Sequence, residues 1–275
     1  MDGAEAAAMF NGFYGMRENP FDKQFREDQC FQSKDFIEMT GRLSRLKDIR
    51  GIGVFTAPPG GGKTFVLRCF ARSLNPSLYQ MKYICLSTVS INEFYTQFCA
   101  ALGVEPSQRK AVMFRNIQER LYVMYKEQRR PLILAIDEAH ELDSRILKDF
   151  KMIMNQNYDS LDCFTLILLG EPHLNSSLQK PVHEALRQRI TIHYNFDGLS
   201  PDETEKYILH KFESAGAAAG SILGDGVLKA IYGYSRGNPR MIDNLMTDTL
   251  TLGAQYNMHI IDTDIVLAAM NNQQL

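Results

Sequence analysis

Residues 57–64 read Ala57-Pro-Pro-Gly-Gly-Gly-Lys63-Thr64 and directly follow the apolar run Gly51–Thr56 (GIGVFT). An amphipathic pattern over Lys63–Leu74 comes next, so the octapeptide connects a predicted buried strand to a predicted helix. Glycines allow backbone N–H groups to turn inward at a helix N-terminus and surround a phosphate. Lys63 would reach the β- and γ-phosphates of a nucleotide, and the Thr64 hydroxyl would hold Mg²⁺. An ordinary glycine turn is the alternative. The strand–loop–helix context favours a phosphate loop, whose nucleotide-binding residues would be Pro59, Gly60, Gly61, Gly62, Lys63, Thr64 and Phe65.

Strand and helix patterns alternate on both sides of this loop. Short continuous apolar runs predict buried strands at Gly51–Thr56, Tyr83–Ser87, Pro131–Ile136, Phe164–Leu169 and Ile190–Phe196. Helical patterns lie between or beside them, at Lys63–Leu74, Ile91–Leu102, Arg109–Gln128, Asp143–Gln156 and His173–Gln188. Such alternation predicts an α/β fold in which helices cover both faces of a five-stranded parallel sheet.

The pattern becomes purely helical after Leu199. Ser200 is placed as an N-cap, Pro201 as the first helical residue, and Glu203 as the partner in a capping box. We therefore expect three parts: an N-terminal segment (residues 1–30), an α/β nucleotide-binding core (31–198) and a small all-helical lid domain (199–275).

A second motif, Leu132-Ile-Leu-Ala-Ile-Asp137-Glu138-Ala139-His140, follows about 75 residues after the loop. A carboxylate at the end of a buried strand is costly unless it serves a cation. Asp137 would orient Mg²⁺ through water, and Glu138 would act as the general base toward the attacking water. Alternatively, these are two acidic residues that open the next helix, where the helix dipole favours them. Paired with the phosphate loop, the motif predicts a nucleoside triphosphatase.

Composition restricts the class of protein further. The 275 residues are 45% hydrophobic and 23% charged, and 30 basic against 32 acidic residues give a net charge of −2. Any polyanion site must therefore be local. Five cysteines suit reduced thiols better than a disulfide framework. The N-terminus lacks the basic start of a signal peptide, and no apolar stretch reaches the ~20 residues of a membrane span. We expect a soluble cytoplasmic protein that is not bound to a membrane.

Two further motifs carry arginines. Leu186-Arg187-Gln188-Arg189-Ile190 precedes the last strand, and either arginine could reach the γ-phosphate of a neighbouring subunit or form a solvated helix end. Gly237-Asn-Pro-Arg240 places Arg240 on the first turn of a helix, where the alternative is a simple loop-to-helix turn with a surface arginine.

These motifs, in this order, resemble those of AAA+ ATPases: Walker A, Walker B, a box VII arginine and a sensor 2 arginine. They are most similar to the ExeA-like branch. Phe13-Tyr-Gly-Met-Arg-Glu-Asn-Pro-Phe21 resembles its N-terminal signature, Asp137-Glu-Ala-His140 its Walker B ending, and Leu168-Leu-Gly-Glu-Pro172 the end of its fourth strand. The resemblance implies an AAA+ core followed by a helical lid.

The resemblance also assigns roles to residues. It implies that Lys63, Thr64, Asp137 and Arg240 bind ATP·Mg²⁺, with Thr64 and Asp137 at the metal. Glu138 becomes the catalytic base, Arg187 or Arg189 the arginine finger, and Glu171 the sensor 1 position. Relatives commonly hold a neutral residue there. A carboxylate facing the γ-phosphate would repel it, so the resemblance implies either that Glu171 points elsewhere or that hydrolysis is slow. Tyr14, Pro20 and Phe21 would pack near the adenine or, alternatively, form an N-terminal strap over the core.

Two lineages share these motifs. One energises secretion and carries a membrane segment with a cell-wall-binding domain, and neither is found before Leu275. The other comprises transposon target-selection regulators of the TnsC and MuB kind, which assemble with ATP as rings or filaments on duplex DNA and recruit a transposase. This second lineage is the leading expectation, with an ATPase that acts on a protein partner in secretion as the alternative. A nucleotide-gated adaptor that barely hydrolyses ATP is a third.

A local basic excess indicates where DNA could bind. Residues 101–130 contain seven Lys or Arg against three Glu. The resemblance places the segments after the second strand at the central channel of an assembly. The phosphate-contact candidates are therefore Thr88, Ser90, Arg109, Lys110 and Arg115. A solvated amphipathic helix is the alternative for each. No recognition helix or zinc finger is evident, so binding should be independent of sequence and sensitive to salt. The six histidines lack metal-ligand spacing, which leaves Mg²⁺ as the expected metal.

Overall fold

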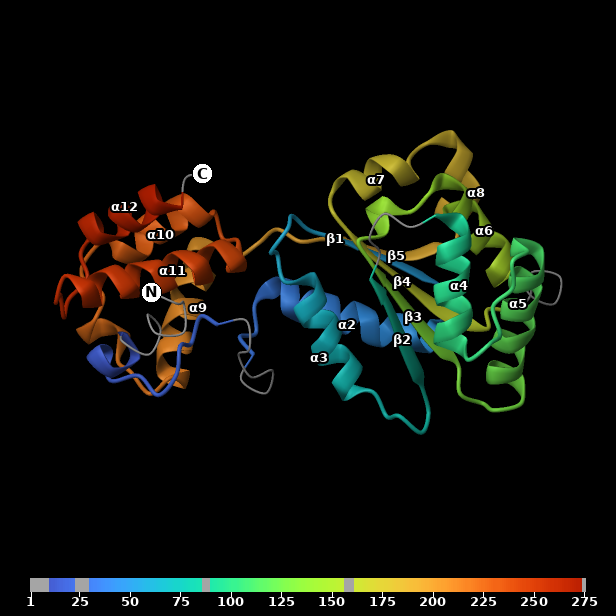
Figure 1. The fold of residues 1–275 in the computed structure, drawn as a ribbon, viewed down its shortest axis with the longest axis horizontal. Coiled ribbons are helices and arrows are strands. Elements are labelled where there is room, and N and C mark those ends of the chain that lie inside the picture. The colour runs from blue at the N-terminus through green and yellow to red at the C-terminus, as the bar shows by residue number, and fades with distance from the viewer. Residues whose placement is uncertain (1–9, 23–29, 86–89, 156–160, 274–275) are drawn as a thin grey trace. The chain divides into compact units, whose positions relative to one another are not determined.

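The computed structural model describes residues 10–22, 30–85, 90–155 and 161–273. The chain divides into two compact units (Figure 1). One comprises residues 1–37, 60–62 and 197–275, and the other residues 38–59 and 63–196.

A five-stranded parallel sheet forms the centre of the larger unit, with the strand order β2-β3-β4-β1-β5. The strands are β1 (Ile52–Thr56), β2 (Gln80–Cys85), β3 (Leu132–Asp137), β4 (Phe164–Gly170) and β5 (Ile190–Asn195). β1, β3 and β4 are buried along their whole length, as their uninterrupted apolar sequences predict. The predicted parallel α/β sheet is therefore confirmed. β4 lies between β1 and β3, so the segments after these three strands meet at one edge of the sheet.

Helices cover both faces of this sheet (Figure 1). α2 (Lys34–Ile49) and α3 (Lys63–Ser73) lie on one side, and α4 (Ile91–Leu102), α5 (Lys110–Lys126) and α6 (Ser144–Met154) on the other. Phe94, Ile117 and Phe150 from the second group pack with strand residues in one core. Gly53 of β1 permits the close approach of α2, because a Cβ there would lie 2.4 Å from the Leu46 Cδ2 atom.

The structure corrects two expectations about helices. The pattern at His173–Gln188 is not one helix but α7 (His173–Leu178), a 3₁₀ turn (Pro181–His183) and α8 (Glu184–Arg187). Pro181 has no N–H and cannot continue a helix from α7, so the chain starts a new turn there. α2 was not expected from the sequence at all. Its N-terminus is held by the Glu203 carboxylate, far away in the chain, whose Oε1 accepts a hydrogen bond from the Lys34 N–H at 2.7 Å.

The smaller unit is helical, with its own apolar core. Its helices are α9 (Pro201–Ser214), α10 (Val227–Ser235), α11 (Pro239–Gln255) and α12 (Thr263–Asn272). The predicted capping box is confirmed: the Ser200 hydroxyl accepts from the Glu203 N–H, and the Glu203 carboxylate accepts from the Ser200 N–H. Phe212, Ile231 and Leu245 are buried in this core.

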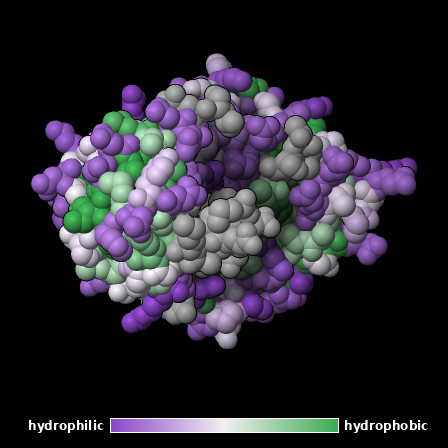
Figure 2. Space-filling view, turned by 60° about the vertical axis from the view of Figure 1, so that its left-hand side comes forward, coloured by the Kyte–Doolittle hydropathy of each residue, from purple (hydrophilic) through white to green (hydrophobic). Residues whose placement is uncertain are grey.

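Large apolar side chains also reach the surface of the helical unit. Tyr256, Ile260 and Leu267 are each more than half exposed. Figure 2, in which the side that carries this unit comes forward, shows hydrophobic patches among hydrophilic residues. Within the described part of the chain, no helix is long and apolar enough to cross a membrane.

Candidate functional site

The phosphate loop places Lys63 at the first residue of α3. Its ammonium donates to the carbonyl oxygen of Ala57 at 2.8 Å and to that of Pro58 at 3.5 Å. Gly60 and Gly62 adopt φ values of +80° and +92°, which L-residues rarely reach, and nothing lies within 4 Å of where a Gly62 Cβ would be. A buried lysine beside an open glycine turn fits a group as large and as negative as a nucleotide phosphate.

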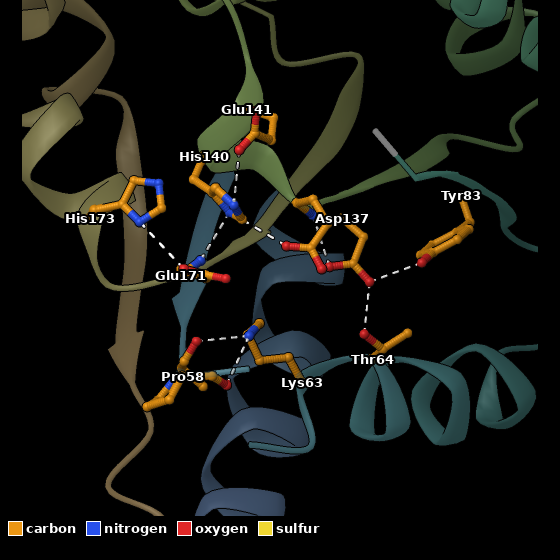
Figure 3. Close-up of polar contacts among 11 residues, drawn as sticks. Pro58, Lys63, Thr64, Tyr83, Asp137, His140, Glu141, Glu171 and His173 are labelled. Atoms are coloured by element: carbon orange, nitrogen blue, oxygen red, sulfur yellow. Dashed lines mark hydrogen bonds and ion pairs between the residues drawn. The ribbon is translucent and has the colours of Figure 1, made fainter. Parts of the chain in front are cut away.

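Asp137 ends β3 and is almost completely buried. Its Oδ2 accepts from the Thr64 hydroxyl at 2.7 Å and from the Tyr83 hydroxyl at 2.9 Å, and its Oδ1 accepts from the Glu138 N–H at 2.9 Å (Figure 3). Thr64 and Asp137 thus meet although 73 residues separate them. Hydroxyl and carboxylate oxygens are the ligands that Mg²⁺ prefers, so this pair fits the metal predicted from the sequence.

Tyr83 belongs to this site, although the sequence did not indicate it. Burial, and then its hydrogen bond to Asp137, raise the pKa of the Tyr83 hydroxyl far above its usual range. The phenol therefore stays protonated and donates to the carboxylate. A single tyrosine on a weak strand pattern gives no functional signal, and only the pairing of β2 with β3 brings it to Asp137.

Glu138 lies just beyond the strand, with φ 54° and ψ 37°. A non-glycine residue in this left-handed region is strained, and such strain gathers at functional sites. Glu138 precedes a 3₁₀ turn (Ala139–Glu141) without any side-chain capping bond, whereas Asp143 caps the following helix α6. Glu138 thus directly precedes a 3₁₀ turn, while the next α-helix begins only at Ser144. The Glu138 carboxylate is partly exposed, and Oε2 lies 3.5 Å from the His140 Nδ1 atom.

Glu171 follows β4, between the phosphate loop and Asp137 along the edge of the sheet. Its N–H donates to the His140 Nδ1 atom at 3.2 Å, and its carboxylate lies 3.6 Å from the His173 Nδ1 atom. The predicted sensor 1 position thus contacts two histidines (Figure 3).

Comparison with known proteins finds a match over the part of the chain that holds this arrangement. Residues 47–178, just under half of the chain, match the family described as AAA domain. The match extends from the end of α2 to α7 and so includes the phosphate loop, Asp137, Glu138 and Glu171.

One relative is similar over almost the whole chain. General secretion pathway protein A of Aeromonas hydrophila is 27% identical over 267 residues, which is 95% of this chain and 48% of the relative. The chain therefore spans about half the length of that relative.

Solved structures show the same fold. The Cdc6p structure from Pyrobaculum aerophilum has a TM-score of 0.71 at 15% identity and covers 92% of this chain and 70% of its own. The Aeropyrum pernix ORC1 protein in complex with DNA gives 0.66 at 15% identity, with 92% and 68% covered. The Thermotoga maritima RuvB Holliday junction branch migration motor gives 0.57 at 18% identity, with 88% and 69% covered. The likeness supports the predicted AAA+ fold.

The two arginine-finger candidates are two residues apart in the sequence but have different surroundings. Arg187, the last residue of α8, donates from Nη1 to the carbonyl oxygen of Gln179 at 3.0 Å and to that of Leu178 at 3.4 Å. These carbonyls end α7, so Arg187 has a structural contact that a finger role would require it to leave. Arg189 lies just before β5 and is half-buried.

Asn175 joins β1, β5 and α7 at the same edge of the sheet, and no sequence pattern predicts this contact. Its amide donates to the Thr56 hydroxyl at 3.2 Å and to the Asn195 Oδ1 atom at 2.9 Å, and its Oδ1 lies 2.9 Å from the His193 Nε2 atom. This network fixes α7, and therefore the preceding Glu171, against the strand ends.

Arg240 occupies the first turn of α11, as predicted. The Asn238 side chain caps this helix by accepting from the N–H groups of Arg240 and Met241. The Arg240 side chain is exposed. Sensor 2 remains its predicted role.

The aromatic N-terminal segment packs within the helical unit. Tyr14 donates to the Met258 carbonyl at 2.9 Å, and Phe21 packs edge-on against Phe212. Burial raises the pKa of Tyr14 to about 12. These contacts are those of a strap, the alternative to an adenine contact.

The described DNA-contact candidates group around the first turns of α4 and α5. Asn92 near the start of α4 donates to the Gln108 carbonyl, and Arg120 within α5 donates to the Leu102 carbonyl at the end of α4, so the two helices run in the same direction. The Ser90 side chain caps α4, whereas Arg109 occupies the N-cap position of α5 without a side-chain capping bond. Thr88 lies outside the described residues.

The other two candidates already have acidic partners. Lys110 pairs with Asp149, and Arg115 lies 3.7 Å from Glu119 one helical turn away. Arg109 is exposed at its helix N-terminus. Of the three cations, it is the one we place first as a phosphate contact.

Proposed function

We propose that the chain is an ATP-dependent regulator that binds ATP at its phosphate loop, hydrolyses it, and couples the bound nucleotide to assembly on a partner. The observation that carries the proposal is the meeting of Thr64 with Asp137 beside the buried Lys63. This set of groups suits a triphosphate with its metal, and few other ligands need a lysine, a hydroxyl and a buried carboxylate together.

Each residue contributes one part of the proposed hydrolysis. Lys63 and the glycine N–H groups neutralise and orient the β- and γ-phosphates. Thr64 and Asp137 hold Mg²⁺, which when bound screens the phosphate charge. Glu138 accepts a proton from the attacking water. Arg189 or Arg187 of a neighbouring subunit and Arg240 stabilise charge on the γ-phosphate.

We propose duplex DNA as the partner, bound through phosphate contacts at the N-termini of α4 and α5, and a ring or filament as the assembled form. Two helix N-termini and the exposed Arg109 present N–H groups and positive charge in one place, as backbone phosphates require. Recruitment of a transposase is the part of this proposal that comes from the motif resemblance. Some proteins of similar fold have names that mention DNA. They support a DNA partner only because they share the fold.

A second candidate function has its own support. The 27% identical relative is a general secretion pathway protein, which favours a protein partner. The two candidates differ in what stimulates ATP hydrolysis, so one experiment separates them.

The test combines DNA binding with phosphate release. Duplex DNA of mixed sequence is incubated with the protein and ATP, ADP or no nucleotide, and assemblies are counted by negative-stain electron microscopy. We expect assemblies only with ATP, lost with Lys63→Ala and retained longer with Glu138→Gln, which binds ATP without hydrolysing it. Arg109→Ala should weaken DNA binding by about tenfold and lower its salt dependence by about one phosphate contact. Arg45→Ala is the matched control, because Arg45 is an exposed arginine of α2, on the other face of the sheet.

Bare DNA in every condition, at low as well as moderate salt, would exclude the DNA partner and leave the secretion candidate. Assembly that persists unchanged in Lys63→Ala would instead exclude the ATP-dependent mechanism itself.

A further inference from the structure

His140, Glu171 and His173 form a cluster of metal-ligating side chains next to the predicted catalytic acids. Each offers one ligand atom, and these atoms all lie within 4.8 Å of one another. The two imidazole rings are 4.4 Å apart, centre to centre, and nearly perpendicular. The absence of ligand spacing in the sequence is therefore misleading here: β3 and β4 are neighbours in the sheet, and the segments that follow them bring these residues together.

The chemistry of the cluster differs from that of the Thr64–Asp137 pair. Imidazole nitrogens are poor ligands for Mg²⁺ but good ligands for Zn²⁺ and similar divalent transition metals. Two histidines with one glutamate is a donor set that zinc sites use, with an open position for water. The three carboxylates around the imidazoles, those of Glu138, Glu141 and Glu171, also favour a cation.

The contacts of His140 resemble those that orient a metal-binding histidine. Its side chain is only 8% exposed, and its Nδ1 atom accepts from the Glu171 N–H, so the ring proton resides on Nε2. Nε2 faces the Glu141 carboxylate at 3.4 Å. A metal-binding histidine commonly donates its second N–H to such a carboxylate, which fixes the ring and raises its basicity. Nδ1 is then the atom directed at a metal, and binding requires it to release the Glu171 N–H.

The three ligand atoms would have to move only slightly closer together to bind one metal ion. Zn–N bonds of about 2.0–2.1 Å place tetrahedral ligands about 3.4 Å apart. The Glu171 Oε2 and His173 Nδ1 atoms are already 3.6 Å apart. His173 is the most exposed member, at 55%, so rotation of its side chain can complete the set.

We propose that His140, Glu171 and His173 form a binding site for Zn²⁺ or a related divalent transition metal, separate from the Mg²⁺·ATP ligands. Because Glu138 lies 3.5 Å from His140, a metal here would sit beside the predicted general base. The proposal requires neither nucleotide nor DNA, so it stands or fails independently of the proposed function.

The test is a Zn²⁺ titration of the nucleotide-free full chain against a fluorescent chelator, in excess Mg²⁺. Cys85 is exposed, Cys30 and Cys69 are half-buried, and thiols compete for zinc, so all proteins carry Cys30→Ser, Cys69→Ser and Cys85→Ser. We expect one equivalent of tightly bound Zn²⁺ in this parent protein. His173→Ala should weaken its affinity by more than about tenfold, since loss of a ligand exceeds loss of an outer partner. His259→Ala, an exposed histidine of the helical unit, is the matched control and should bind as the parent does.

Glu171→Gln provides a second variant, which keeps the size of the side chain while weakening it as a ligand, and it should also lower the affinity. Two results would overturn the proposal: no equivalent of zinc bound by the parent, or equal affinity in the parent and in folded His173→Ala and Glu171→Gln proteins.

Discussion

At the scale of single residues, the helical unit contains a buried ion pair with an unusual titration. The Lys211 Nζ and Asp243 Oδ1 atoms are 3.6 Å apart, and Tyr207 donates to the same Oδ1 at 2.8 Å. Burial raises the pKa of Asp243 to about 6, although Lys211 and Tyr207 oppose the shift. Burial likewise lowers the pKa of Lys211, against the attraction of Asp243 and Asp22.

This shift predicts a pH dependence of stability. The Asp243 carboxylate takes up a proton at higher pH in the folded state than in the unfolded chain, where the pKa of an aspartate is 3.8. The stabilisation from this group is therefore complete below about pH 4 and is lost as the pH rises through about 6. Asp243→Asn should remove this pH-dependent stabilisation. Between about pH 4 and 6, the free energy of unfolding should therefore fall less in the variant than in the wild type. Urea denaturation at several pH values measures the difference, and identical pH profiles would contradict the assignment.

At the scale of elements, one carboxylate serves two helix N-termini. Glu203 accepts from the Ser200 N–H at the start of α9 and from the Lys34 N–H at the start of α2. Burial disfavours its charged form, but these hydrogen bonds outweigh burial and lower its pKa. Glu203 therefore explains why α2 begins at residue 34, which local sequence did not predict.

Removal of the Glu203 carboxylate should lower the free energy of unfolding more than removal of a residue that caps one helix. We expect Ser200→Ala to lower the free energy of unfolding by about 1 kcal/mol and Glu203→Ala by about 2 kcal/mol, because the latter leaves N–H groups of two helices without a partner. Glu205→Ala on the exposed face of α9 is the control and should change it by less than about 0.5 kcal/mol. Equal effects of the substitutions at 203 and 205 in urea denaturation would show that Glu203 caps neither helix.

At the scale of the whole molecule, two separate apolar cores hold the two units. A ligand stabilises the state that binds it, by about 2.7 kcal/mol at a hundred times its dissociation constant. Mg·ATP should therefore raise the thermal unfolding midpoint in a Glu138→Gln background, which prevents hydrolysis, and should not raise it when Lys63→Ala is added. Differential scanning calorimetry measures both proteins, and an equal rise in the two would place the nucleotide away from the phosphate loop.

The parallel sheet could be predicted from the sequence, because buried strands between amphipathic helices have few other ways to pack. The phosphate loop and the Asp137–Glu138 pair could also be recognised as candidates, because the functional groups of each motif are neighbours in the sequence. The start of α9 could also be predicted, because the two residues of a capping box are only three positions apart in the chain.

Features that depend on which strands are neighbours could be found only in the folded protein. Tyr83 reaches Asp137 because β2 pairs with β3, and Asn175 joins β1 to β5. His140 meets Glu171 and His173 because β4 lies beside β3. Each of these contacts joins residues that are separated by tens of positions, and their single polar side chains leave no periodic or spaced pattern in the chain. Strand order, which is set by the packing of the whole core, brings them together.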